Sequence, residues 1–458
     1  MTVVGVTLLH HTFGFLYASS DLVPYLQDYF NTSSGAITFY TSSLFACEAI
    51  STPLGAMLSQ IIGFRWSTFI SILLTSGGLL LSQLTLNYGL GPLIFTSSIM
   101  FGFGIGASYS VLYAVATAWF PNHRSIIVGI IASGLGLGAL VLVPIQTAVI
   151  NPNNLQNFTH PEVKNNIPKA FSVLGGFILC LQIIGFALLR EKHSDVEMSI
   201  ELSTIADSQT VETVMENEKE LIVRNYTTLE ALRTIDFYLA FLINFFNSAL
   251  TGLTSSTVKT YGRDCGFDNN FLVIVLTLSS VFNCLGRLTW GIIGNRYSFK
   301  GPLIILQIEW ASLWFTYGFV TQVGGTAAKA LFAIWTFLLY TCLAANFVLI
   351  PNLATRIFGP RSMPTIFGLL FAAMAPSTLI LSGVIAHFDI RGQWVPIYCS
   401  GAGFAVIGLI LTLFLRDPNG ACTAWTNSCA RVCDCCRCDP KEEDVWNKTE
   451  ISDKKEFN

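Results

Sequence analysis

Long apolar stretches recur along the whole 458-residue chain, and they constrain its fold more than any other feature. Each is close to the roughly 20 residues that a helix needs to cross a bilayer. Within lipid, every backbone polar group must be satisfied inside the protein, which favours helices. The sequence therefore predicts an all-α membrane protein. Twelve transmembrane helices are expected, at 3–26, 38–62, 67–86, 91–115, 124–149, 169–189, 235–258, 270–294, 302–321, 328–350, 364–387 and 394–415.

The composition agrees with a lipid environment. Only 12% of the residues are charged and 52% are hydrophobic, whereas about 25% of residues are charged in ordinary soluble proteins. The mean hydropathy is +0.58. The net charge of −3 is small, and no clustered basic face indicates a nucleic-acid partner. The lipid bilayer is the partner that these numbers favour.

The first apolar stretch raises the question of a signal peptide. It contains His10, His11 and Asp21 and lacks a small-residue cleavage site after a short apolar core. We therefore interpret it as a spanning helix.

Polar segments divide the chain into two similar parts. Residues 1–189 hold six expected spans, and residues 233–415 hold six more. Residues 190–232 form a polar segment rich in Glu, Ser and Thr, and a second polar segment runs from 416 to 458. Two six-helix halves joined by a hydrophilic linker fit the repeat architecture of the major facilitator superfamily. An unrelated twelve-helix protein remains the alternative.

Positive charge and glycosylation signals set the expected orientation. The basic residues of the short loops are evenly divided between the two sides. Arg190, Lys192, Arg233 and Arg416 break this tie, because they lie close to span ends where the positive-inside rule counts them. Both termini are thus expected in the cytoplasm, in a plasma-membrane protein. Glycosylation sequons begin at Asn31 and Asn157, and both fall in expected outer loops.

Two glycine-rich runs, "GFGIGAS" (102–108) and "GLGLGAL" (134–140), resemble phosphate-binding loops only superficially. A dinucleotide-binding fingerprint follows a strand and opens a helix. Both runs lie inside apolar spans instead. Close packing of neighbouring helices is the better interpretation, because small residues let backbones approach within a membrane.

Several motifs resemble one branch of the major facilitator superfamily, the oxalate/formate antiporters and the related monocarboxylate transporters. They are the stretch 102–140 with its Trp-Phe-Pro turn at 119–121, "TTLEALRTIDFYLAF" (227–241), "GRLTWGIIGNRYSFK" (286–300) and residues 352–383. The resemblance implies a twelve-helix transporter for a small organic anion.

The superfamily's loop motif is kept only in part. It carries an acid after the second and eighth helices, but this chain has Gln60 and Asn295 at those positions. An amide can still form hydrogen bonds there, without the charge-assisted contribution. We therefore do not expect the charged contact that this acid usually makes with neighbouring helix ends on the cytoplasmic side.

Arg287 is the residue most indicative of the cargo. A charge in a membrane helix is costly and normally faces the protein interior and a partner. Its planar fork matches a carboxylate. In monocarboxylate transporters, an arginine at this place is implicated in substrate binding, often with an acid one turn earlier. Here that position is Asn283, so an anionic substrate could serve as the counter-ion. The alternative is a structural pair between Arg287 and Glu48.

Further candidate residues come from the helices that line the pocket in this superfamily. The candidate substrate-binding residues are Tyr17, Tyr113, Gln146, Asn346 and Phe371, beside Arg287 and Asn283. The candidates for proton coupling are His11, Asp21 and Glu48, with His10 beside them. Oxalate-type members carry a lysine where this chain has Met374, so one deep cation favours a monocarboxylate over a dicarboxylate.

The last polar segment contains six of the twelve cysteines. Their spacing gives no clean pair of C-x-x-C units and no histidine is near, so no metal is expected. Disulfides do not fit a cytoplasmic segment. Reversible palmitoylation is the favoured interpretation, with Cys433, Cys435, Cys436 and Cys438 as candidates.

The sequence thus predicts a secondary active transporter that moves a small organic anion, a monocarboxylate, by alternating access. It leaves open whether a proton moves with the anion, and whether the protein works by symport, exchange or uniport. The alternatives are a transporter of this superfamily for another small solute and a transport-inactive membrane sensor or scaffold. No catalytic constellation indicates an enzyme, and no cofactor is expected. The sequence leaves open whether an accessory membrane protein takes part.

Overall fold

The computed structural model describes residues 1–32, 34–153, 155, 158–191, 225–387 and 392–417. Within these ranges the chain is helical and contains no strand. The longer helices are α1 Thr2–Phe13, α2 Phe15–Phe30, α3 Ser34–Ile62, α4 Phe64–Thr85, α6 Phe101–Thr117, α7 Arg124–Ile150, α8 Pro161–Ala187, α12 Ile235–Asp264, α13 Asn269–Tyr297, α14 Lys300–Val320, α15 Gly325–Phe358, α16 Met363–Phe371, α17 Met374–His387 and α18 Trp394–Phe414. Shorter elements are η1 Leu86–Tyr88, α5 Leu90–Ile94, the π-helical η2 Phe95–Met100, η3 Pro121–His123, α11 Thr228–Leu232 and η5 Thr321–Val323.

The expected all-α membrane architecture is confirmed. In the described part of the chain, 11 helical segments are long and apolar enough to cross a membrane. The remaining expected span, 3–26, is divided into α1 and α2, which have 12 and 16 residues. Gly14 joins them without a gap in the backbone bonding, because its N–H donates to His11 and its carbonyl accepts from Ala18. The first expected span is therefore continuous, with an irregular turn at Gly14.

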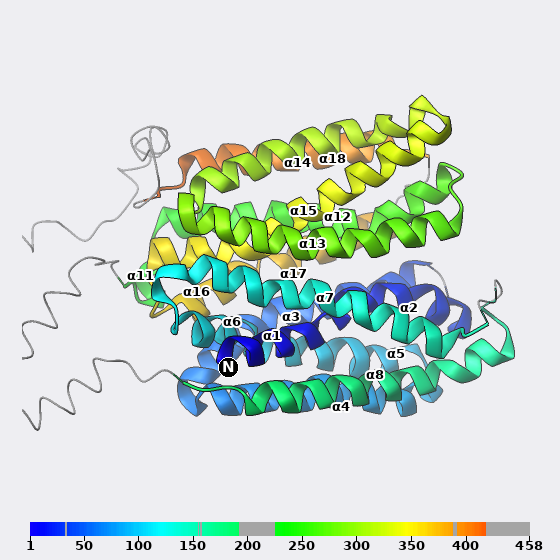
Figure 1. The fold of residues 1–458 in the computed structure, drawn as a ribbon, viewed down its shortest axis with the longest axis horizontal. Helices are drawn as coiled ribbons and strands as arrows, with labels where there is room; N and C mark the ends of the chain where they lie inside the picture. Colours follow the sequence, from blue (N-terminus) through cyan, green and yellow to red (C-terminus); the bar gives the residue numbers. More distant parts are fainter. Residues whose placement is uncertain (33, 154, 156–157, 192–224, 388–391, 418–458) are drawn as a thin grey trace, which may run out of the picture.

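The helices form two adjoining bundles. In Figure 1 the helices coloured blue to cyan lie together on one side, and most helices coloured green to orange lie on the other. Contacts on two sides connect the bundles: α7 packs along α13 and against α15, and α3 packs against α16 and α17, with α6 also touching α16. The centre of the molecule is thus lined from both parts of the sequence.

Both glycine-rich runs lie at tight helix contacts, as their composition predicted. A Cβ atom on Gly106 would lie 2.6 Å from the Thr52 backbone N. Gly129, which precedes the second run in α7, makes a similar contact, since its Cβ would lie 2.6 Å from the Arg287 carbonyl oxygen. Gly134 and Gly138 approach the backbone of α1 in the same way. These contacts show the close backbone approach that small residues permit in membranes.

The two ends of the described chain lie at one end of the bundle. The hydroxyl of Thr2 donates to the Arg190 carbonyl, where α8 has just ended. Where the chain resumes after 224, the N–H of Tyr226 donates to the Phe358 carbonyl. The last described residue, Asp417, accepts from the Ser298 hydroxyl beyond α13. Gln60, which stands in place of the motif acid, donates to Thr365 at the same end, between the bundles.

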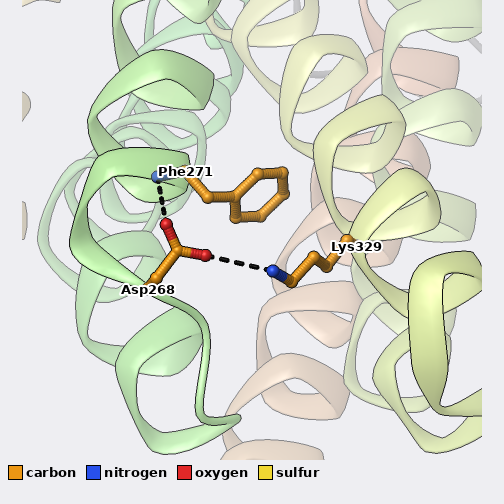
Figure 2. Close-up of polar contacts among 3 residues, drawn as sticks. All are labelled: Asp268, Phe271 and Lys329. Carbon is orange, nitrogen blue, oxygen red and sulfur yellow. Dashed lines mark hydrogen bonds and ion pairs between the residues drawn. The ribbon is translucent and has the colours of Figure 1, made fainter.

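The opposite end of the bundle carries an ion pair that ties α13 to α15. Figure 2 shows Asp268, which accepts from the Phe271 N–H at 3.0 Å and pairs with Lys329 at 3.0 Å. The carboxylate therefore caps the first turn of α13. The Phe271 N–H, and secondly Lys329, lower the pKa of Asp268. The cap consequently stabilises the fold at pH values above the ordinary pKa of an aspartate. This contribution is lost as the pH falls through the lowered pKa.

We predict that Gly129→Ala lowers the melting temperature of the purified protein in detergent. The added methyl group would overlap the Arg287 carbonyl and meet Gly291 Cα at 3.2 Å, and overpacking of this kind costs about 1–3 kcal/mol. Gly176→Ala in α8 is the matched control, because its Cβ would enter open space. Equal melting temperatures for the two variants would contradict the packing account.

Candidate functional site

Arg287 is fully buried in α13 and donates hydrogen bonds in three directions. Its Nε donates to Asn283 Oδ1 at 3.0 Å and its Nη1 to the Ala132 carbonyl of α7 at 2.9 Å. Its Nη2 donates to the Tyr17 hydroxyl of α2 at 3.2 Å. The guanidinium therefore bridges the two bundles, and each of these three acceptors is neutral.

Tight packing on two sides of α13 fixes the guanidinium. Gly291 lies against α7, and a Cβ on Gly286 would lie 3.0 Å from Ala344 Cβ of α15. Asn283 lies one turn before Arg287 on the same face, and its Nδ2 donates to the Tyr340 carbonyl of α15. The amide therefore has a fixed orientation, with its oxygen directed to the guanidinium.

Aromatic rings from both bundles surround the guanidinium of Arg287. We call Arg287 and the side chains packed around it the central cluster. The Arg287 Cζ atom lies 4.8 Å from the Phe347 ring centre and 6.0 Å from that of Tyr17. Phe371 lies 6.2 Å from Phe347 and 5.4 Å from Tyr109, centre to centre. Ring faces attract a desolvated cation. The predicted pocket residue Phe371 thus joins the cluster through Phe347.

Irregular helix turns flank this cluster. Gly14 separates α1 from α2 three residues before Tyr17, and the break between α16 and α17 directly follows Phe371. In several transporter folds, broken helices supply the substrate site. The two breaks come from different bundles. A movement of one bundle relative to the other would therefore change the surroundings of the cluster.

Glu48 of α3 is the buried acid of the cluster. It is fully buried, and neither of its carboxylate oxygens has a hydrogen-bond partner in the described structure. Its charge interacts with that of Arg287, and also with Tyr17, Tyr109 and Tyr113. The expected alternative, a direct Arg287–Glu48 salt bridge, is not formed between these two described side chains.

The two candidate histidines occupy different surroundings. The His10 ring is buried and lies 4.9 Å from the Tyr113 ring and 5.3 Å from that of Tyr109. Its Nδ1 donates to the Val6 carbonyl and its Nε2 has no partner in the part of the chain described. The His11 backbone lies against Gly134 and Gly138 of α7. The structure therefore brings His10 to the cluster and leaves His11 in the α1–α7 contact.

Asp21 and Gln146 form a separate polar group. Gln146 Nε2 donates to Asp21 Oδ2 at 3.2 Å, and the Thr147 hydroxyl donates to the same oxygen at 3.4 Å. The charge of Lys259 in α12 also acts on Asp21. Asp21 lies one helical turn beyond Tyr17, about 6 Å along α2. Gln146 is thus placed with Asp21 and not with Arg287.

Asn346 belongs to an amide network in the second bundle. It accepts from Asn247 at 3.0 Å and donates to Asn244 at 3.1 Å. Gln307 donates to Asn247 at 2.7 Å, and Asn244 donates to the Leu370 carbonyl. The network adjoins the cluster, because Phe347 follows Asn346 in the chain. Its bonds join α12, α14, α15 and α16.

Sequence reasoning missed two members of the cluster. Ala132 contributes only its backbone carbonyl, so no side-chain pattern could identify it. Phe347 is one of 35 phenylalanines. Its position beside Asn346, on a helix already expected to line the pocket, was the available signal.

The remaining predicted sites are outside the centre. Asn31 is exposed and ends α2 in a left-handed conformation. Asn157 and the four candidate cysteines Cys433, Cys435, Cys436 and Cys438 lie outside the described residues. No cluster of three or more His, Cys, Asp or Glu side chains that could hold a metal ion occurs among the described residues.

Comparison with known proteins shows which family and which fold this chain resembles. The model of the Major Facilitator Superfamily matches residues 6–214. Apicoplast pyruvate carrier 1 of Toxoplasma gondii is 25% identical over 74% of this chain and 67% of that protein. The oxalate:formate antiporter of Oxalobacter formigenes is 22% identical over 72% and 71%. Human monocarboxylate transporter 12 is 28% identical over 38% of this chain and 32% of that protein.

Solved structures confirm the expected fold. The proton:xylose symporter XylE bound to 6-bromo-6-deoxy-D-glucose superimposes with a TM-score of 0.70 at 15% identity, over 91% of this chain and 97% of that chain. The Escherichia coli fucose:proton symporter FucP gives a TM-score of 0.61 at 14% identity, over 90% and 99%.

We predict that Asn346→Ala lowers the melting temperature of the purified protein. The truncation would leave the Asn247 amide and the Asn244 oxygen without their partners, at a cost of about 1–3 kcal/mol. Thr254→Val is the control, because this buried hydroxyl donates to Leu250 within its own helix. An unchanged melting temperature in Asn346→Ala would contradict a structural role for the network.

Proposed function

Because residues 6–214 match the model of the major facilitator superfamily, we propose that this chain belongs to that superfamily and carries a small monocarboxylate across the membrane by alternating access. Arg287 is the proposed carboxylate anchor. Asn283, Tyr17 and Phe347 hold the guanidinium in position. The protein acts as a transporter and not as an enzyme, in agreement with its family.

The proposal rests on the number of N–H donors of Arg287 that remain unbonded. A guanidinium has five N–H donors, and three of them are bonded here, which leaves two. One carboxylate accepts two parallel N–H bonds from an arginine. Each of the three bonded acceptors is neutral, so the anion would be the negatively charged hydrogen-bond partner that Arg287 lacks, in a place where a charge without such a partner is costly.

The surroundings favour a small monocarboxylate over a dicarboxylate. Phe347, Phe371 and Tyr109 offer apolar faces for a short organic chain, as small-molecule sites generally do. Met374, where oxalate-type relatives carry a lysine, is buried and uncharged. The similarity to a pyruvate carrier and to monocarboxylate transporters supports the same class.

Polar contacts between the bundles at both ends support alternating access. Gln60 donates to Thr365 at one end. The hydroxyls of Ser42 and Ser382 hydrogen-bond to each other nearer the other end. Each contact joins α3 to α16 or α17. Opening the central cluster to one side requires only the contact on that side to break, so the two can separate in turn.

We also propose that the end with Thr2, Arg190 and Asp417 faces the cytoplasm of a plasma-membrane protein. Arg190 and Arg416 border that end, and cytoplasmic loops are enriched in such residues. Asn31 lies at the opposite, outer end and is exposed, which supports glycosylation there.

The central test is uptake of radiolabelled pyruvate and lactate by cells that express the protein. We expect saturable uptake in the wild type, and at least about a 30-fold loss of apparent affinity in Arg287→Gln. Removing one partner of a buried charge pair costs about 2–5 kcal/mol. Arg287→Lys should recover only part of the loss, since an ammonium lacks the planar fork.

Arg263→Gln is the matched control, because this exposed arginine ends α12 at the outer end of the bundle. Surface expression is measured for every variant. No saturable uptake of any monocarboxylate by the wild type would contradict the proposed function. Uptake that survives unchanged in Arg287→Gln would contradict only the anchor assignment.

A further inference from the structure

We propose that Glu48 is the proton-binding site of the transporter, and that it and the bound carboxylate alternate as the counter-ion of Arg287. The inference rests on the proposed function and adds the residue of this chain that carries the coupled proton. It accounts for a feature that the carboxylate anchor alone leaves unexplained, a second ionisable group buried at the same site.

The position of Glu48 is fixed by close packing between α3 and α6. A Cβ on Gly106 would lie 2.7 Å from the Glu48 carbonyl oxygen, and one on Gly102 would lie 3.1 Å from its N. The same carbonyl accepts from the Thr52 hydroxyl at 2.7 Å. The backbone of Glu48 is therefore held firmly between α3 and α6, while its carboxylate oxygens are left without hydrogen bonds in the described structure.

The described groups that face Glu48 include one cation and no second acid. Its charge acts on Arg287 from α13, on Tyr17 from α2, and on Tyr109 and Tyr113 from α6. His10 of α1 contacts the same two α6 rings. In α4 the titratable side chain is Arg65, which donates to the Leu189 carbonyl near the cytoplasmic end. The described side chains of α16 and α17 add no titratable group.

Charge neutrality then links the proton to the cargo. In the empty site, ionised Glu48 and Arg287 sum to zero. When a carboxylate binds Arg287, the site holds two anions and one cation unless Glu48 takes up a proton. A net buried charge costs several kcal/mol in a low dielectric. The proton and the anion therefore bind together, and one proton crosses with each monocarboxylate.

The proton step is a simple reversible transfer. A proton from the solution to which the site is open forms an O–H bond with one Glu48 oxygen, and it returns to solution on the other side. No net charge moves in the loaded or the empty transition. Transport should therefore respond to a pH gradient and not to membrane potential.

His10 is the competing proton site, and the charge balance disfavours it. Protonated His10 would place a second cation beside Arg287, whose charge already acts on it. It would also leave Glu48 ionised next to the bound anion. His10→Gln is therefore the variant that tests the competing site.

The experiment uses purified full-length protein in liposomes with radiolabelled pyruvate and an internal pH dye. In the wild type, an inward proton gradient should drive accumulation together with internal acidification. Glu48→Gln should lose both by at least about tenfold and keep pyruvate exchange in the absence of a gradient. Glu48→Asp, which keeps a carboxyl group, should retain gradient-driven accumulation. Internal acidification that is lost in His10→Gln and kept in Glu48→Gln would assign the proton to His10 instead.

Binding to the purified protein gives a second measurement. Wild-type affinity for pyruvate should fall by about tenfold per pH unit once Glu48 is ionised, because one proton is linked to one anion. Affinity in Glu48→Gln should be independent of pH in this range. Gradient-driven acidification that survives in Glu48→Gln, an unchanged pH slope, or loss of pyruvate binding at every pH would overturn the inference.

These outcomes separate the inference from the function on which it rests. If the wild type transports no monocarboxylate, the proposed function fails before Glu48 is tested. If the wild type transports pyruvate without acidification, the function holds and the role of Glu48 is wrong.

Discussion

The burial of the Arg287 guanidinium is the constraint on which the rest of the structure depends. A charge that lies at 0% exposure in a membrane helix must be solvated by the protein itself. Here an amide, a carbonyl and a hydroxyl do so, from α13, α7 and α2. Because these acceptors come from both bundles, any relative movement of the bundles changes the solvation of the charge. In the proposed function, cargo binding and conformational change thereby act on the same group.

The glycine-rich contacts make this arrangement possible. The Ala132 carbonyl reaches the guanidinium because α7 and α13 approach closely at Gly129 and Gly291. The first bundle uses the same device, where Gly102 and Gly106 bring α6 against the backbone of Glu48. Close backbone approach, which lipid-embedded helices achieve through small residues, thus positions the cation on one side and the acid on the other.

Much of the fold could be predicted because lipid imposes a length and an apolar composition on each span. The relatives found by comparison include members of the expected branch of the superfamily, whose motifs lie at turns where particular residues are required. The pairing of polar side chains was harder to predict from the sequence. Asn346 and Gln146 are polar residues of pocket helices, but their partners are Asn244, Asn247 and Asp21. Which amides pair depends on helix rotation, and the hydropathy of nearly all-apolar helices carries little information about it.

The most direct measurement of the central claim is an experimental structure with a bound small monocarboxylate. Our account predicts that both carboxylate oxygens lie about 2.7–2.9 Å from the guanidinium nitrogens of Arg287, with the organic chain against Phe347 and Phe371. A carboxylate bound elsewhere, with Arg287 still held by Asn283, Ala132 and Tyr17 alone, would contradict it.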